Sequence, residues 1–180
     1  MEQNQSVYMI ESGIVNMRYY TKEGNVVTVL QKVPGDLYGI KGLFHFKGEK
    51  NFYSVAATDV RCWKISRLDF LNLLETNSEF TICAFQWFTT YMDTIERKML
   101  NSAFLNTYQR LILTLTDFAE MTGNNKGTVH LTQQEIANIL ATSRQTVSAY
   151  LTLLEDSGLI QIKRGQILLN DMDALKEELV

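Results

Sequence analysis

The first part of the chain alternates apolar and polar residues in short runs that end at glycines or charged turns. Val15, Met17 and Tyr19 recur at a period of two within one run, which is typical of a half-buried strand. A polar turn at residues 22–25 leads into the apolar run 26–30, so these runs predict a hairpin. Further β-rich runs occupy residues 8–13, 52–58 and 60–65. Short strands joined by such turns predict a small antiparallel barrel or sandwich.

The periodicity changes after residue 65. Ser66 and Asp69 have the spacing of a capping box, which predicts a short helix over residues 70–74. Residues 78–106 contain no glycine or proline, and at ~1.5 Å per residue they predict a helix on the order of 40 Å long. A coiled-coil-like apolar seam runs along it, formed by Ala84, Phe88, Tyr91, Ile95 and Met99. The seam either packs on the chain's own barrel or joins two copies, and we expect the dimer because the helix is so long.

Two helical patterns separated by a polar break fill residues 131–160. Thr132 and Glu135 have capping-box spacing, which predicts the start of the first helix. Either Thr142 or Ser143 is suited to cap the second helix, which a glycine ends. Two amphipathic helices joined by so short a break are typical of a helix-turn-helix, whose second helix enters the major groove of DNA.

The side chains at the start of that second helix are poor core material, but they suit DNA. Arginine donates to guanine, glutamine pairs with adenine, and hydroxyl groups hold phosphate. Two β-rich runs, 159–162 and 166–169, then flank a basic tip and predict a wing that touches phosphate. The predicted DNA-binding residues are Thr132, Ser143, Arg144, Gln145, Ser148, Lys163 and Arg164. The alternative is an ordinary helical hairpin with a β-hairpin cap, which leaves the agreement of caps, break and wing unexplained.

The composition of the chain limits which classes of protein are possible. The chain has 180 residues, of which 46% are hydrophobic, so it can bury a core. The polar N-terminus is no signal peptide, and no apolar run approaches the roughly 18 residues of a membrane helix. With only two cysteines, we expect a soluble cytoplasmic protein with reduced thiols. The net charge of −3 does not exclude DNA binding, because the acidic segment 171–178 carries all of it and a DNA-binding face is local.

Two stretches, PGDLYGIKGLF at 34–44 and the whole of 131–160, resemble the Crp/Fnr family of bacterial transcription regulators. The resemblance implies an α+β fold with a jelly-roll barrel of the cyclic-nucleotide-binding type, a long dimerisation helix and a C-terminal winged helix-turn-helix. We place these parts at residues 1–77, 78–106 and 107–180. The implied partners are a double-stranded DNA operator, a second copy of the chain and a small-molecule effector, with RNA polymerase as a further candidate.

The chain departs from the family pattern in three respects. Where cyclic-AMP-binding members have a glutamate and an Arg-Ser pair, it has Ile40 and Lys50-Asn51, so we expect an effector other than cyclic AMP. Cys62 and Cys83 do not supply the four thiolates of an iron–sulfur cluster, and we expect no cofactor. The strand at 8–13 resembles one that several elements normally precede, so we expect an N-terminally shortened barrel that is either incomplete or completed by a partner. By resemblance, the effector site lies near Lys50, Asn51, Phe88, Tyr91 and Met92.

Two other classes of protein are alternatives to a regulator. A metal-dependent enzyme of the cupin type needs a histidine cluster, whereas His45 and His130 fall in different predicted domains. No nucleophile elbow, Walker loop or dinucleotide fingerprint is present, so we expect no catalytic residue and no metal. A ligand-binding barrel that no longer regulates DNA remains the main alternative. It would bind DNA only through salt-sensitive attraction that is blind to sequence.

Overall fold

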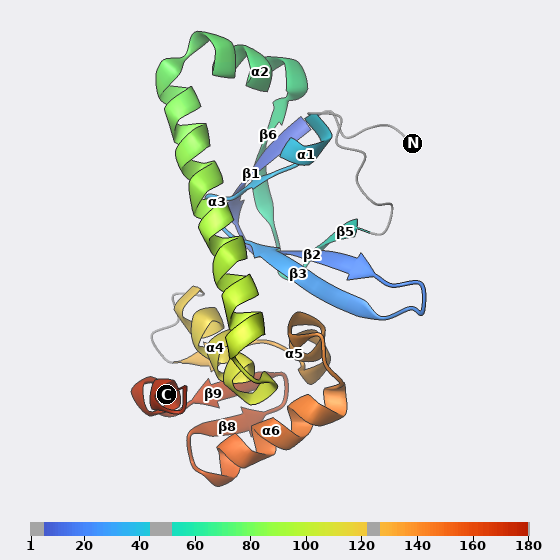
Figure 1. The fold of residues 1–180 in the computed structure, drawn as a ribbon, viewed down its shortest axis with the longest axis vertical. Helices are drawn as coiled ribbons and strands as arrows, with labels where there is room; N and C mark the ends of the chain where they lie inside the picture. Colours follow the sequence, from blue (N-terminus) through green and yellow to red (C-terminus); the bar gives the residue numbers. More distant parts are fainter. Residues whose placement is uncertain (1–5, 44–51, 122–126, 180) are drawn as a thin grey trace. The chain divides into compact units, whose positions relative to one another are not determined.

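The computed structural model describes residues 6–43, 52–121 and 127–179 (Figure 1). The chain divides into two compact units, residues 1–97 and 98–180. The boundary between them falls inside one long helix, so each unit is considered by itself. The predicted three-part division at residues 77 and 106 stays a prediction.

Within its described residues, the first unit contains two antiparallel sheets of three strands each, in the orders β4-β1-β6 and β3-β2-β5. The strands are β1 (Ser6–Ser12), β2 (Val15–Tyr20), β3 (Val26–Lys32), β4 (Leu37–Tyr38), β5 (Phe52–Ala56) and β6 (Arg61–Ser66). The hairpin predicted from the period-two pattern is β2–β3, in which Tyr20 pairs with Val26. A bulge after Met17 opposes two residues of β3 to one of β2, which strengthens the local twist. The α+β fold class is confirmed, with a β-rich N-terminal unit ahead of the helices.

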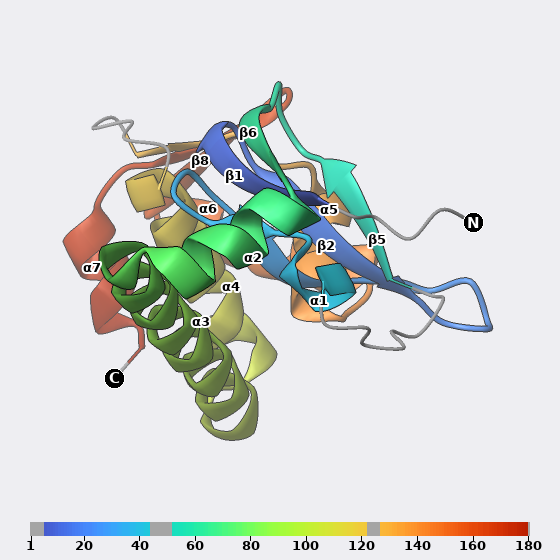
Figure 2. The ribbon, with the colours of Figure 1, turned by 90° about the horizontal axis from the view of Figure 1, so that it is seen from above.

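Two short helices cover one face of the β4-β1-β6 sheet: α1 (Ile40–Leu43) and α2 (Arg67–Thr76). Val7, Leu43 and Phe70 form the buried centre of this contact. Ser66 caps α2 by accepting from the Asp69 amide at 3.1 Å, as the spacing predicts. The predicted bounds 70–74 were too narrow, because a capped helix begins directly after its cap. In Figures 1 and 2, α2 leads from the end of β6 to the start of α3.

The long helix α3 (Ser78–Phe104) confirms the predicted helix but stops two residues before Asn106. It ends there because Asn106 belongs to the next helix, where its side chain accepts from the Gln109 amide at 2.9 Å. None of the 27 residues of α3 is buried. Its exposed large apolar side chains are Ile82, Phe85, Phe88, Met92, Met99, Leu100 and Phe104. So much uncovered apolar surface on one helix is typical of an interaction face.

In the described part of the second unit, four helices, α4 to α7, pack on a small antiparallel sheet of order β7-β9-β8. The elements are α4 (Thr107–Met121), β7 (Thr128–Val129), α5 (Gln133–Leu140), α6 (Arg144–Asp156), β8 (Ile160–Lys163), β9 (Gln166–Leu169) and α7 (Met172–Glu177). Every helix from α4 to α6 buries an apolar stripe. The fully buried side chains include Leu111, Ile112, Leu115, Ile136, Val147, Leu151, Leu154 and Ile160.

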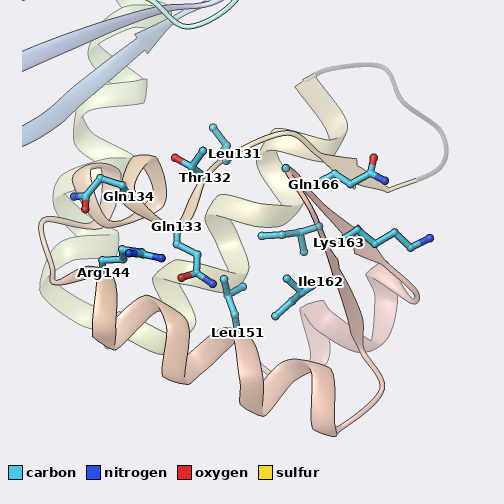
Figure 3. Close-up of a pocket in the computed structure, with 11 residues that line it drawn as sticks. Leu131, Thr132, Gln133, Gln134, Arg144, Leu151, Ile162, Lys163 and Gln166 are labelled. Carbon is cyan, nitrogen blue, oxygen red and sulfur yellow. The ribbon is translucent and has the colours of Figure 1, made fainter.

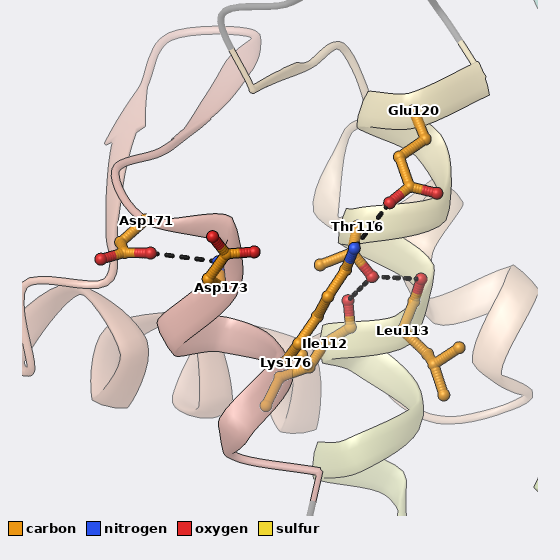
Figure 4. Close-up of polar contacts among 7 residues, drawn as sticks. All are labelled: Ile112, Leu113, Thr116, Glu120, Asp171, Asp173 and Lys176. Atoms are coloured by element: carbon orange, nitrogen blue, oxygen red, sulfur yellow. Dashed lines mark hydrogen bonds and ion pairs between the residues drawn. The ribbon is translucent and has the colours of Figure 1, made fainter.

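The C-terminal helix α7 is fastened to α4 by an ion pair. Lys176 Nζ lies 2.8 Å from Glu120 Oε1, and this contact raises the pKa of Lys176 (Figure 4). Asp171 caps α7 by accepting from the amides of Asp173 and Ala174, each at 3.0 Å. Residues of the acidic segment 171–178 therefore cap α7 and attach it to α4.

Candidate nucleic-acid interface

The interface begins at the cap of α5. Thr132 Oγ1 accepts from the Glu135 amide at 3.2 Å, and Glu135 Oε2 accepts from the Thr132 amide at 2.9 Å. This reciprocal pair confirms the predicted capping box. Because both groups are satisfied locally, the first turn of α5 is fixed before any ligand arrives.

A left-handed residue and a serine cap make the turn between α5 and α6. Ala141 adopts φ 52° and ψ 47°, and the amide of Thr142 donates to the Ala137 carbonyl at 3.0 Å. The cap of α6 is Ser143, whose Oγ accepts from the Thr146 amide at 3.1 Å. A single αL residue followed by a new cap redirects the chain within three residues, which is the geometry of a helix-turn-helix.

The two faces of α6 differ sharply in polarity. Its inner face carries Val147, Leu151 and Leu154, all fully buried. Arg144 and Gln145 are exposed in its first turn, and Ser148 one turn later is half-buried. The predicted recognition residues therefore share the outward N-terminal end of one helix, where amide groups also favour an anion.

The wing is the hairpin β8–β9 with a two-residue turn at Arg164-Gly165. Gly165 has φ 77°, a conformation that favours glycine. Lys163 pairs with Gln166 as the last rung, so the first strand, 160–163, begins and ends one residue later than the predicted 159–162. Glu155 Oε1 accepts from the Ile162 amide at 2.7 Å and ties the wing to α6. Lys163 and Arg164 are both exposed at the tip.

A cleft of about 480 Å³ lies between α5, α6 and the wing (Figure 3). Leu151, Ile162 and Ile167 form its floor, while Arg144 and Lys163 contribute to its rim. Gln133 extends into it from the first position of α5 (Figure 3). The structure thus brings Thr132, Arg144 and Lys163 to one cleft. The turn between β8 and β9 places Arg164 immediately beside it.

Sequence reasoning missed three polar side chains of this cleft, Gln133, Gln134 and Gln166. Gln133 directly follows the cap Thr132, and Gln166 is the hairpin partner of Lys163. Their positions next to a helix cap and opposite a wing lysine are the sequence signals from which they could have been predicted.

The residues predicted for the effector and dimer sites lie in different places. Lys50 and Asn51 fall outside the described residues. Phe88, Met92 and Met99 are exposed on α3, whereas Ala84, Tyr91 and Ile95 are half-buried. Tyr91 faces β3, where it lines a small cavity without Phe88 or Met92. Both groupings stay predictions.

Within residues 6–43, 52–121 and 127–179, no three histidine, cysteine or acidic side chains are grouped as a metal site. Over the same ranges, no helix has the length and apolar character needed to cross a membrane.

A capped helix-turn-helix with a basic wing, preceded by a β-rich unit and a long helix, defines a winged-helix DNA-binding regulator. Family models agree with this class. Residues 1–77 match the cyclic nucleotide-binding domain, and residues 109–178 match the Crp-like helix-turn-helix domain. The chain belongs to the Crp/Fnr family of DNA-binding transcription regulators, which are not enzymes.

Individual relatives agree with the family but differ in effector. The cAMP-activated global transcriptional regulator CRP of Salmonella typhimurium is 29% identical over 163 residues, covering 88% of this chain and 78% of the relative. The CRP-family regulator TTHB099 of Thermus thermophilus has a similar fold, with a TM-score of 0.84 at 21% identity over 99% of this chain and 89% of that one. The c-di-GMP responsive regulator CLP of Xanthomonas campestris also matches, with a TM-score of 0.79 at 19% identity over 94% and 86%.

Proposed function

We propose that the protein is a homodimeric, sequence-specific regulator that binds a two-fold symmetric DNA operator through α6 and the wing. The observation that carries this is the N-terminal end of α6, where exposed Arg144 shares a cleft with Lys163 of the wing and Gln145 next to it is exposed. Its working compartment is the cytoplasm, where the DNA is. A dimer repeats this surface about a two-fold axis, so the operator is expected to be palindromic.

In this proposal the side chains of α6 divide the work of reading DNA. Arg144 donates to guanine in a bidentate contact, and Gln145 donates to and accepts from adenine. Ala149, exposed one turn after Gln145, touches a thymine methyl group. Thr132, Ser143, Ser148, Lys163 and Arg164 hold phosphates and set the register.

The dimer seam follows from which face of α3 is left uncovered. Phe85, Phe88, Met92, Ile95 and Met99 recur at spacings of three, four, three and four residues. All except the half-buried Ile95 are exposed in the single chain. Three of these belong to the predicted seam, but Tyr91 is turned toward β3 and is replaced here by Met92. A second copy covers this stripe through an isologous contact.

The effector is proposed to be a small molecule other than cyclic AMP. Ile40 packs against the buried cluster of Val7, Leu43 and Phe70. Its aliphatic side chain has no group to accept from a ribose hydroxyl, and turning it outward would cost apolar burial. The family's matched relatives respond to more than one ligand, so the family alone does not fix the effector.

Selection of binding sites from random DNA tests the proposal. The wild type is expected to enrich a palindrome whose half-sites differ from those of Gln145→Glu at one base pair, because glutamate accepts from cytosine instead of pairing with adenine. Ala149→Ser serves as a matched control, since it should change a neighbouring position only. Enrichment of no palindrome, with binding that declines equally on every sequence as salt rises, would favour a barrel without regulatory DNA binding.

A further inference from the structure

A lysine is buried at the end of β3. Lys32 is only 6% exposed, and charged side chains are almost never so covered unless they are paired. Its Nζ lies 4.1 Å from the ring centroid of Tyr91 and 4.9 Å from that of Trp87. The same atom is 3.8 Å from Asp36 Oδ1. Two aromatic rings and a carboxylate therefore surround this ammonium group, which is the composition of an aromatic cage for cations.

The walls of the cage are themselves held in place. Trp87 and Tyr91 are one helical turn apart on α3, and their rings stack with centroids 5.4 Å apart and planes 13° apart. Trp87 Nε1 donates to Asp36 Oδ1 at 3.3 Å. Asp36 Oδ2 accepts from the Val33 amide at 3.0 Å, within the turn after β3. Each wall is thus fixed by a neighbour other than Lys32, so the cage is a built site.

The cage lies where α3 has few other means of holding its orientation. No residue of α3 is buried, although Phe80 at its beginning stacks edge-on against Phe70. Beside the cage a cavity of about 50 Å³ remains, lined by β3 and by Thr90 and Thr94 of α3. Burial raises the pKa of Tyr91, and the nearby Asp36 carboxylate raises it further. The Tyr91 ring presents its face to Lys32 Nζ.

We propose that Asp36, Trp87 and Tyr91 form a cation-binding site that takes a primary alkylammonium group, and that Lys32 occupies it as a tethered ligand. The occupied site fixes the rotation of α3 about its own axis. That rotation turns Tyr91 toward β3 and leaves Phe85, Phe88 and Met92 outward. The consequence for the dimer rests on the proposed function, whereas the cation site does not.

Chemical rescue tests the site directly. Lys32→Ala removes three carbons and the ammonium nitrogen, which n-propylammonium supplies as a free molecule. In the full chain carrying Trp63→Phe, Trp87 is the only tryptophan, since the sequence has two. Lys32→Ala should shift the Trp87 emission, and n-propylammonium should restore it with saturation. The neutral n-propanol, of matched size, should not.

Two further variants guard against a folding defect. Lys32→Arg keeps a cation of suitable length and should preserve the Trp87 emission without any additive. Lys32→Met keeps the apolar stem without the charge and should show the shifted emission while remaining folded by circular dichroism. Equal rescue by n-propanol, or an unchanged emission in Lys32→Ala and Lys32→Met, would overturn the proposal.

DNA binding provides a separate readout of the consequence. Lys32→Ala should weaken operator binding by roughly 5–150-fold, the range of typical coupling between sites, and n-propylammonium should recover it. If the wild type binds no operator while the fluorescence results are as expected, the proposed function is wrong and the cation site is still supported. If the wild type binds the operator but the Trp87 emission responds to neither the Lys32 variants nor n-propylammonium, only the cation site is wrong.

Discussion

The helices α6 and α3 differ in how much of their apolar surface is buried within the single chain. In α6 the apolar residues Val147, Leu151 and Leu154 are fully buried and the exposed residues of its first turn are polar. In α3 no residue is buried, and Phe85 and Phe88 are 68% and 50% exposed. One helix is complete within its own unit and presents hydrogen-bonding groups. The other is incomplete as a single chain and presents apolar surface.

The difference indicates what each helix binds. Polar groups on a rigid, already covered helix suit a polar surface such as the edges of DNA bases. An uncovered apolar stripe at heptad spacing suits a second apolar stripe, since burial of apolar surface drives association. Under the proposed function, the comparison separates the residues assigned to DNA reading from those assigned to the dimer, and the following substitutions test that separation.

The largest effect is expected from a charge in the apolar stripe. Met92→Glu places like charges opposite one another across a two-fold interface and should yield monomers. Loss of the second half-site should weaken operator binding by roughly 10²–10⁴-fold, the usual gain from joining two binding modules. Sedimentation and gel-shift titration measure the two consequences.

Gln86→Glu is the matched control, because Gln86 is exposed on α3 but lies off the apolar stripe. It should remain dimeric and bind DNA as the wild type does. A dimeric Met92→Glu would place the seam elsewhere on the molecule.

The next effect belongs to Arg144. Arg144→Ala should remove about 1–3 kcal/mol of base discrimination in each half-site, with no change in dimerisation. Arg144→Lys keeps the charge without the planar fork, so it should recover non-specific binding but not specificity. Competition between operator and random DNA measures the difference. If Arg144→Lys discriminates as well as the wild type, the contact is to phosphate.

The helix-turn-helix could be predicted because its determinants are local. The cap at Thr132, the cap at Ser143 and the glycine after α6 each act within a few residues, and all lie where the pattern predicts them. The rotation of α3 could not be predicted in the same way. It depends on Lys32, which lies just beyond the predicted strand 26–30 and meets α3 only in the folded unit. A helical seam read from spacing alone does not distinguish Tyr91 from Met92.

A smaller effect is expected at the wing. Lys163→Ala should weaken binding to all sequences alike and lower the salt slope by about one for each half-site. Lys176→Ala is the matched control, because that lysine is also exposed in the second unit but is paired with Glu120. Titrations at several salt concentrations compare the two. A Lys163→Ala variant that loses affinity for the operator alone would show that Lys163 reads bases.

The smallest effect separates two roles of Ser143. Its Oγ accepts from the Thr146 amide, so Ser143→Ala should cost about 1 kcal/mol of unfolding free energy, as loss of a helix cap typically does. Ser143→Asp also caps a helix and should keep the stability of the wild type, but its carboxylate repels phosphate. If Ser143 holds a phosphate as well as the helix, the aspartate variant will be stable and bind DNA less well. Denaturant titration gives the first quantity and gel shift the second. An aspartate variant with unchanged affinity would restrict Ser143 to capping, and the first phosphate contact would then fall to Thr132 at the start of α5.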